Sequence, residues 1–201
     1  MKVQNLWALA SILLVSNSGF SASTPAAAKT VYALDAQQSS VEFIAVGRPS
    51  ALRIRGKGAK PEGKISFENS KVSGEFLINL KEFESGISLR DRHMKEKYLE
   101  VEKPGNDKAK LSITEISMTP RQLSKPGFSG EGKFSGKLSL HGKEQPVSGS
   151  IDLKSTGEHQ FKGDAKMKLK IADFGIDIPS FSGITVANDV DVAVSFVAKK
   201  Q

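Results

Sequence analysis

The chain has 201 residues, of which 38% are hydrophobic and 25% are charged, and it contains no cysteine. This composition excludes a disordered chain and a bundle of membrane-spanning helices. The missing cysteine excludes disulfides, thiolate metal sites and a cysteine nucleophile. The formal net charge of +7 is compatible with a nucleic-acid partner or an anionic membrane surface. The length suits one domain with a sizeable core.

The first 28 residues have the features of a secretory signal. Lys2 gives the positive start, an apolar run covers residues 6–15, and small residues follow up to Ala28. The apolar run is too short for a stable transmembrane helix. We therefore predict a signal peptide at residues 1–28, one domain at residues 29–201, and a periplasmic or secreted protein. A retained N-terminal anchor is the alternative.

From Val31 onward, apolar residues recur at every second position. The clearest case is residues 161–171, where the odd positions are apolar or small and four of the even positions are lysine. A period of two indicates strands with one dry face and one solvated face. The pattern predicts eight to ten strands. They fall at about residues 31–37, 40–47, 51–57, 63–69, 71–81, 109–119, 128–141, 145–155, 159–172 and 187–198.

Short turns such as Lys125-Pro126-Gly127 separate these strands, which is typical of an antiparallel meander. Closing a meander into a barrel removes its exposed edges. The lysines of the strands fall on outward positions with no aromatic residues between them, so we interpret them as a solvated face. We therefore predict an all-β antiparallel barrel and no nucleic-acid partner.

Residues 88–99 break the alternation. Asp91 and Lys95 stand four residues apart, and Met94 and Tyr98 share this spacing on another face. Pairs at this spacing meet on the surface of a helix. We predict a short helix that lies over one end of the barrel.

This helix carries a polar cluster, Arg90, Asp91 and His93, for which we compare a catalytic role with a structural one. An enzyme would use His93 as a base oriented by Asp91. We favour the alternative that Arg90 and Asp91 fasten the helix to the barrel rim by a salt bridge and backbone bonds. A role in gating or in binding a ligand headgroup stays open. His93, His141 and His159 lack metal-ligand spacing, so we expect no metal site and no cofactor.

The interior of a small barrel is either filled by side chains or holds one small ligand. Inward glycines and alanines leave room, while phenylalanines line the interior. A cavity of this kind has no polar selectivity along its length, so a long apolar chain is its natural occupant. A filled barrel with a structural or stress-response role is the alternative. The phenylalanines expected to line the interior are Phe43, Phe67, Phe76, Phe134, Phe161 and Phe196.

Several stretches of the chain resemble a known family. They are Tyr32-Ala33-Leu34-Asp35 with residues 39–43, residues 63–67, residues 85–94 with Arg90-Asp91-Arg92-His93-Met94, residues 136–143 and residues 173–176. In these stretches the sequence resembles the YceI-like family, the lipocalin-like polyisoprenoid-binding proteins of bacteria. The resemblance implies an eight-stranded antiparallel lipocalin-like barrel with one short helix. It also implies a periplasmic or secreted carrier that is not an enzyme.

The resulting hypothesis is an exported carrier for a polyisoprenoid, an isoprenoid quinone, a fatty-acid derivative or a similar long-chain amphiphile. The headgroup would lie near Arg90, Arg92 and His93, and the tail would lie against the phenylalanines. We expect no stable membrane insertion, and a homodimer stays open. An isomerase acting on apolar substrates is a less favoured alternative. The candidate ligand-binding residues are Phe43, Phe67, Phe76, Ile78, Ile87, Leu89, Arg90, His93, Met94, Tyr98, Phe134, Leu138, Phe161, Met167, Leu169 and Phe174.

Overall fold

The computed structural model describes residues 29–201 apart from residues 50–51, 69–70, 124, 158 and 182, so the predicted signal at residues 1–28 lies outside it. The strands are β1 (Thr30–Leu34), β2 (Ser40–Arg48), β3 (Leu52–Gly56), β4 (Pro61–Glu68), β5 (Lys71–Asn79), β6 (Lys108–Ile116), β7 (Ser129–Leu140), β8 (Lys143–Gly157), β9 (Gln160–Lys170), β10 (Ser180–Phe181) and β11 (Ile184–Lys200). The helical segments are η1 (Ala36–Gln38), η2 (Leu80–Glu82), α1 (Ser88–Arg92), η3 (His93–Tyr98), α2 (Pro120–Leu123) and η4 (Ile171–Phe174).

The strands close into an eight-stranded antiparallel barrel, as the sequence predicts. The order around the wall is β1-β4-β5-β6-β7-β8-β9-β11, and β11 closes the circle by pairing with β1, where Tyr32 lies opposite Lys200. Strand β2 follows β1 along the same side of β11, and β3 pairs with β2. The long strand β11 therefore pairs on this side with two shorter strands in succession, β1 and β2.

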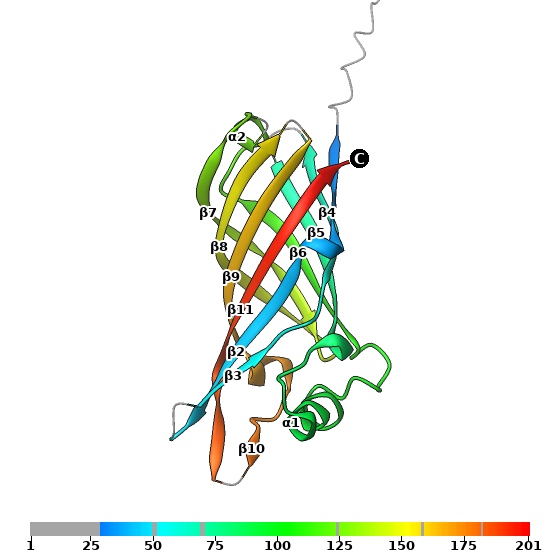
Figure 1. Cartoon of the computed structure of the whole chain (residues 1–201), viewed down its shortest axis with the longest axis vertical. Helices are drawn as coiled ribbons and strands as arrows, with labels where there is room; N and C mark the ends of the chain where they lie inside the picture. The colour runs from blue at the N-terminus through cyan, green and yellow to red at the C-terminus, as the bar shows by residue number, and fades with distance from the viewer. Residues whose placement is uncertain (1–28, 50–51, 69–70, 124, 158, 182) are drawn as a thin grey trace, which may run out of the picture.

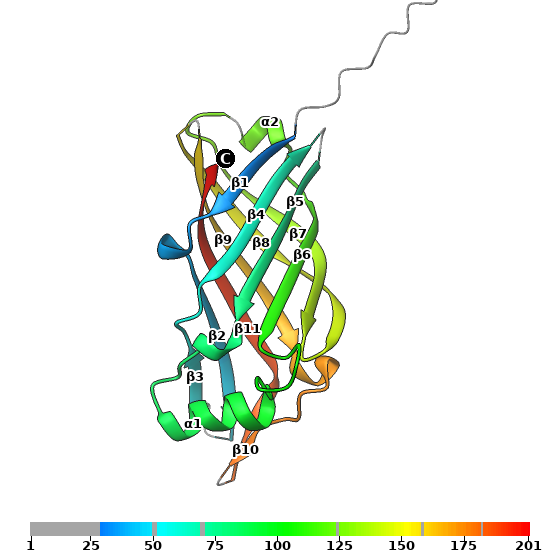
Figure 2. The same ribbon diagram turned by 90° about the vertical axis from the view of Figure 1, so that its right-hand side faces the viewer.

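The two ends of the barrel differ (Figures 1 and 2). We call the end that carries β1, the C-terminus and α2 the closed end. We call the opposite end, which carries β3, α1 and β10, the open end. At the open end, β2 and β3 extend the wall beyond β1, and the segment from η2 to η3 lies beside them. The predicted short helix is present as α1 with its π-helical continuation η3. Among the described residues, no helix is long and apolar enough to cross a membrane.

Burial alternates along the strands as the period of two predicts. On β9, Phe161 is buried, Lys162 is exposed, and the alternation continues to Lys170. Phe196 on β11 lies opposite Gly163 on β9, and a Cβ atom at Gly163 would stand 2.3 Å from the Phe196 ring. Only glycine leaves space for this ring inside the wall.

Large rings fill the interior toward the closed end. Their centroids lie 4.9 Å apart for Tyr32 and Phe161, 5.0 Å for Tyr32 and Phe67, and 5.5 Å for Phe76 and Phe196. Phe161 also contacts both Phe67 and Phe196. We call Tyr32, Phe67, Phe76, Phe161 and Phe196 the aromatic cluster. It packs this half of the barrel as a solid core.

Replacing one ring of this cluster should destabilise the whole barrel. Phe196 is 2% exposed, so we expect Phe196→Ala to lower the free energy of unfolding by about 3–5 kcal/mol. The matched change Phe181→Ala removes a ring that is 65% exposed, and we expect it to cost less than about 0.5 kcal/mol. Urea denaturation followed by circular dichroism measures both. Equal losses would contradict the solid core at the closed end.

Candidate ligand-binding cavity

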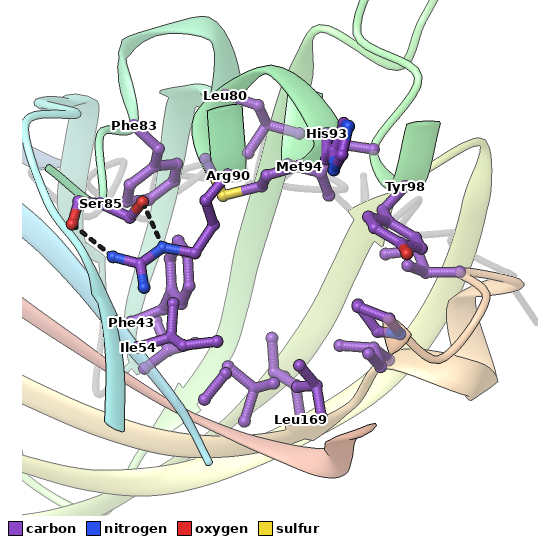
Figure 3. A pocket seen from close by; sticks show the side chains of 18 of the residues that line it. Phe43, Ile54, Leu80, Phe83, Ser85, Arg90, His93, Met94, Tyr98 and Leu169 are labelled. Carbon is purple, nitrogen blue, oxygen red and sulfur yellow. Dashed lines mark hydrogen bonds between the residues drawn. The ribbon is translucent and has the colours of Figure 1, made fainter. Parts of the chain in front are cut away.

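A cavity of about 420 Å³ occupies the barrel toward the open end (Figure 3). Its volume lies in the range of about 300–1,000 Å³ that is usual for ligand sites, and a single buried water needs only about 10–15 Å³. Leu52, Leu89 and Phe181 line the cavity and are also exposed, so it reaches the surface at this end. The barrel is therefore solid in one half and hollow in the other.

The wall of the cavity comes from inward positions of β2, β3, β5, β6, β7, β9 and β11. Phe43 on β2 lies opposite Gly56 on β3, and a Cβ atom at Gly56 would stand 2.0 Å from the Phe43 ring. The same ring meets Phe83 edge-on, with centroids 5.2 Å apart. Ala45, two residues further along β2, also faces inward and leaves space where a larger side chain would fill the barrel.

The helical segment covers the cavity from one side. Arg90, Met94 and Tyr98 are spaced by four residues and all line the cavity, as do Leu89 and His93. The helix begins after Ile87, whose carbonyl oxygen accepts a hydrogen bond of 2.9 Å from the Asp91 amide. Figure 3 shows Arg90, Met94, His93 and Tyr98 along this side, facing Leu169 across the space.

Ser85 fixes the start of this helix through three groups. Its backbone N–H donates to Asp91 Oδ1 over 2.7 Å, and its hydroxyl donates to the same oxygen. Arg90 Nε donates to the Ser85 hydroxyl and Arg90 Nη2 to the Ser85 carbonyl, each over 2.7 Å. Arg90 and Asp91 thus fasten the helix through Ser85. The expected salt bridge with a carboxylate is absent for Arg90 among the described residues.

The cavity lining has few polar side chains, and its permanent charge is positive. Thirty of the described residues line it, and those among them with polar or charged side chains are Ser85, Arg90, His93, Tyr98 and Ser180. No carboxylate is among them, so the guanidinium of Arg90 is the one permanent charge on the lining. Arg90 Nη1 has no hydrogen-bond partner among the described residues. A hydrogen bond from Nη1 to an anion or another strong acceptor would be strengthened by the low polarity of the surroundings.

His141 joins three segments at the edge of this site. Its Nε2 lies 3.0 Å from Glu100 Oε2, just after η3, and its Nδ1 lies 3.2 Å from the carbonyl oxygen of Phe174 in η4. Both partners are acceptors, so each ring nitrogen that carries a proton can donate to the partner that it faces. Glu100 and His141 each have a positive φ, 49° and 51°, which is uncommon outside glycine. The helical segment is thus held at its far end as well.

The chain matches the family model described as a YceI-like domain over residues 32–198. It belongs to the YceI-like family. The polyisoprenoid-binding domain from Saccharophagus degradans implicated in plant cell wall breakdown is similar, with a TM-score of 0.67, 14% identity, and coverage of 85% of this chain and 98% of that one. BcnA from Burkholderia cenocepacia is also similar, with a TM-score of 0.65, 16% identity, and coverage of 82% and 98%. At these identities the likeness shows the fold. No curated protein matches the chain.

The structure of this YceI-like domain brings many of the sequence-predicted site residues together around the cavity. Arg92 is exposed on α1 and does not line it. The predicted residues that do line the cavity are Phe43, Ile78, Ile87, Leu89, Arg90, His93, Met94, Tyr98, Leu138, Met167 and Leu169.

Five predicted residues lie outside the lining and are buried elsewhere in the core. Phe67, Phe76 and Phe161 belong to the aromatic cluster. Phe134 is buried and packs over Gly149, where a Cβ atom would stand 2.7 Å from its ring. Phe174 is buried in η4, and its carbonyl oxygen contacts His141. These five residues do not line the cavity, and a role for them in ligand binding stays a prediction.

The enzyme alternative also meets a geometric difference. It required Asp91 to orient His93, whereas the Asp91 carboxylate binds Ser85. The His93 ring instead lies against Phe181, with centroids 6.1 Å apart.

Sequence reasoning missed other residues of the site. Ile54 lies between two exposed arginines on β3, so the period of two could have identified it as an inward residue. Ser85 has no sequence signal, since its role depends on the fold of the following helix. Phe181 lies on β10, which has two residues and is too short for any periodicity. Phe83 follows η2 and has no pattern around it.

The His141 contact gives a testable pH dependence. The pKa of the Glu100 carboxyl is lowered from its ordinary value of 4.5, first by the hydrogen bond from Lys103 and then by that from His141. A lowered folded-state pKa stabilises the fold above the ordinary value, and this contribution is lost as the pH falls through the lowered pKa. We therefore expect amide protection in residues 93–101 to fall, relative to the barrel strands, as the pH drops below the ordinary carboxyl value of 4.5.

Hydrogen exchange, corrected for the intrinsic rate at each pH, measures this effect. Glu100→Gln is the matched control, because it removes the titrating group. We expect this variant to show reduced protection at neutral pH and no further acid-dependent loss. An equal acid-dependent loss in both proteins would contradict the assignment to Glu100.

Proposed function

We propose that this YceI-like protein is an exported binding protein for a long-chain amphiphile of the polyisoprenoid class. The tail lies in the cavity of the open half, and an acceptor-bearing head lies beside Arg90. The observation that carries the proposal is an apolar cavity with a single permanent cation on its lining. The polyisoprenoid-binding domain from Saccharophagus degradans, with the same fold, supports this class of ligand. The signal features of residues 1–28 support export.

The physical scale of the interaction favours a long tail. Each buried methylene contributes about 0.8 kcal/mol, so about fifteen of them contribute about 12 kcal/mol. The loss of free motion on association costs at least about 4 kcal/mol. The remainder is at most about 8 kcal/mol, which corresponds to micromolar affinity at best. Short-chain compounds should therefore bind weakly, whatever their headgroup.

The head chemistry follows from Arg90. Two of its nitrogens are held by Ser85, which leaves Nη1 to donate to a carbonyl, phosphate or carboxylate oxygen of the ligand. A quinone, a polyprenyl phosphate and a fatty acid share this acceptor chemistry. A barrel with a filled interior, the structural alternative, does not agree with the volume of the cavity.

A direct test is organic extraction of the protein purified from bacterial cells, followed by mass spectrometry. We expect a lipid with a prenyl or other long aliphatic chain in the extract. Added prenyl alcohols and fatty acids should also bind, with affinity rising with chain length. Recovery of no lipid from any host, together with no binding of added lipids, would overturn the proposal.

A cavity-filling variant tests the location of the tail. Ala45 is 5% exposed and lines the cavity, so Ala45→Phe should reduce affinity for a fluorescent long-chain fatty acid by roughly tenfold or more. The neighbouring Ile44→Phe puts the same ring on the outer face of β2, and we expect its affinity to be unchanged. Titration of both folded variants measures the difference. Equal affinities would place the tail elsewhere.

A charge variant tests the head. Arg90→Met should reduce the affinity for a long-chain acid about tenfold more than the affinity for the alcohol of the same tail, because a hydrogen bond to a charged group is worth about 1.5–3 kcal/mol. Arg92→Met removes an exposed arginine from the same helix and should leave this ratio unchanged. An unchanged ratio in the Arg90 variant would remove Arg90 from the headgroup site.

A further inference from the structure

Large exposed apolar side chains gather at the open end of the barrel. Phe181 is 65% exposed, Ile87 54%, Leu89 44%, Leu52 41% and Ile178 36%, and these are the exposed large hydrophobic residues of the described chain. All but Ile178 also line the cavity, and Ile178 precedes Pro179, which lines it. We call these five residues the apolar rim. It surrounds the entrance of the cavity.

Three segments far apart in the sequence build the apolar rim. Leu52 lies on β3, Leu89 on α1 and Phe181 on β10, and Figure 2 shows these elements together at the open end. Exposed apolar residues of a monomeric protein are normally scattered singly, and a gathered patch marks an interaction site. Because these side chains are exposed, they bury little apolar surface and contribute little to the stability of the barrel. Their common position therefore needs another explanation.

The elements that carry the rim are also basic. On β2 and β3, three arginines flank Leu52, and Arg55 among them pairs with Glu42. The helix after Leu89 adds further cations. The basic residues are Arg48, Arg53, Arg55, Arg92, Lys95 and Lys97, against the acidic residues Glu42, Glu84, Glu96 and Asp177. The surroundings of the rim thus carry a net positive charge, since Arg90 and Asp91 are both bound to Ser85.

We propose that the apolar rim docks the protein on an anionic phospholipid bilayer. The five apolar side chains enter the boundary between headgroups and acyl chains, and the surrounding arginines and lysines contact lipid phosphates. The mouth of the cavity then faces the bilayer. Docking goes beyond the proposed function and rests on it only for its purpose, the transfer of an amphiphile between the bilayer and the cavity.

Charge favours a bilayer over a second copy of the chain. A symmetric dimer through the rim would place the same patch on both partners and so bring the basic residues of each copy together. Like charges across an interface oppose association. An anionic surface instead offers opposite charge over the whole of the rim.

A single fluorescent label tests the contact directly, because the chain contains no cysteine. An environment-sensitive fluorophore is attached to Ile87→Cys in the rim or to Lys162→Cys on β9 near the closed end. We expect a blue shift and quenching by brominated lipid for the rim label alone, on vesicles of phosphatidylcholine with phosphatidylglycerol. No response of the rim label, or an equal response of both labels, would overturn the proposal.

Two further outcomes have defined meanings. A response on phosphatidylcholine alone that equals the response on anionic vesicles would overturn the electrostatic part of the proposal. A blue shift that grows with protein concentration in the absence of vesicles would show pairing of two copies and overturn it altogether. No ligand is added in any of these measurements. A positive response, together with no lipid in the extract and no binding of added lipids, would therefore reject the proposed function and keep the docking surface.

Variants separate the apolar and charged contributions to vesicle affinity. With the label at Ile87→Cys, the double change Leu89→Ser with Phe181→Ser should weaken affinity by roughly tenfold or more. Ile44→Ser on the outer wall is its control. Arg53→Gln with Arg92→Gln should weaken affinity several-fold on anionic vesicles, whereas Lys154→Gln with Lys162→Gln near the closed end should not. Equal effects of the test and control variants would contradict the rim.

Discussion

The uneven distribution of ring volume along the barrel determines the rest of the structure. Toward the closed end, the aromatic cluster packs with centroids 4.9–6.3 Å apart, whereas the cavity lies toward the other end. Toward the open end, inward positions such as Ala45 and Ala109 are small. Ladder hydrogen bonds fix the spacing between neighbouring strands, so the wall does not collapse onto the missing volume. The small inward side chains in the open half therefore leave a cavity there.

The helical cover and the polar corner of the cavity depend on one another. Ser85 holds Asp91 at the start of the helix and Arg90 at the cavity. Its hydroxyl donates to the carboxylate and accepts from the guanidinium, so one small side chain connects two opposite charges without a direct ion pair. Since Arg90 is positioned by the same group that starts the helix, a change at the headgroup site also affects how the helix is held.

The sequence predicts the barrel well, because a period of two is a direct consequence of a strand with one buried face. It does not predict the height of an inward residue along the barrel axis. Phe43 and Phe67 both face inward, yet Phe43 lies opposite Gly56 beside the cavity and Phe67 lies opposite Thr30 near the closed end. Only strand register separates them. His141 and Glu100 are 41 residues apart in the sequence, and both have left-handed backbone conformations. No local sequence pattern indicates such a contact.

The cavity wall and the apolar rim share Leu52, Leu89 and Phe181, so apolar surface continues from the interior to the outside. For a ligand this continuity matters, because a tail of about fifteen methylenes that passes through water loses about 12 kcal/mol of burial on the way. Such a cost would make exchange slow at any affinity. A mouth placed against a bilayer keeps the tail in apolar surroundings throughout. If the protein carries an amphiphile as proposed, the exposed side chains of the open end form part of the route by which the tail enters the barrel.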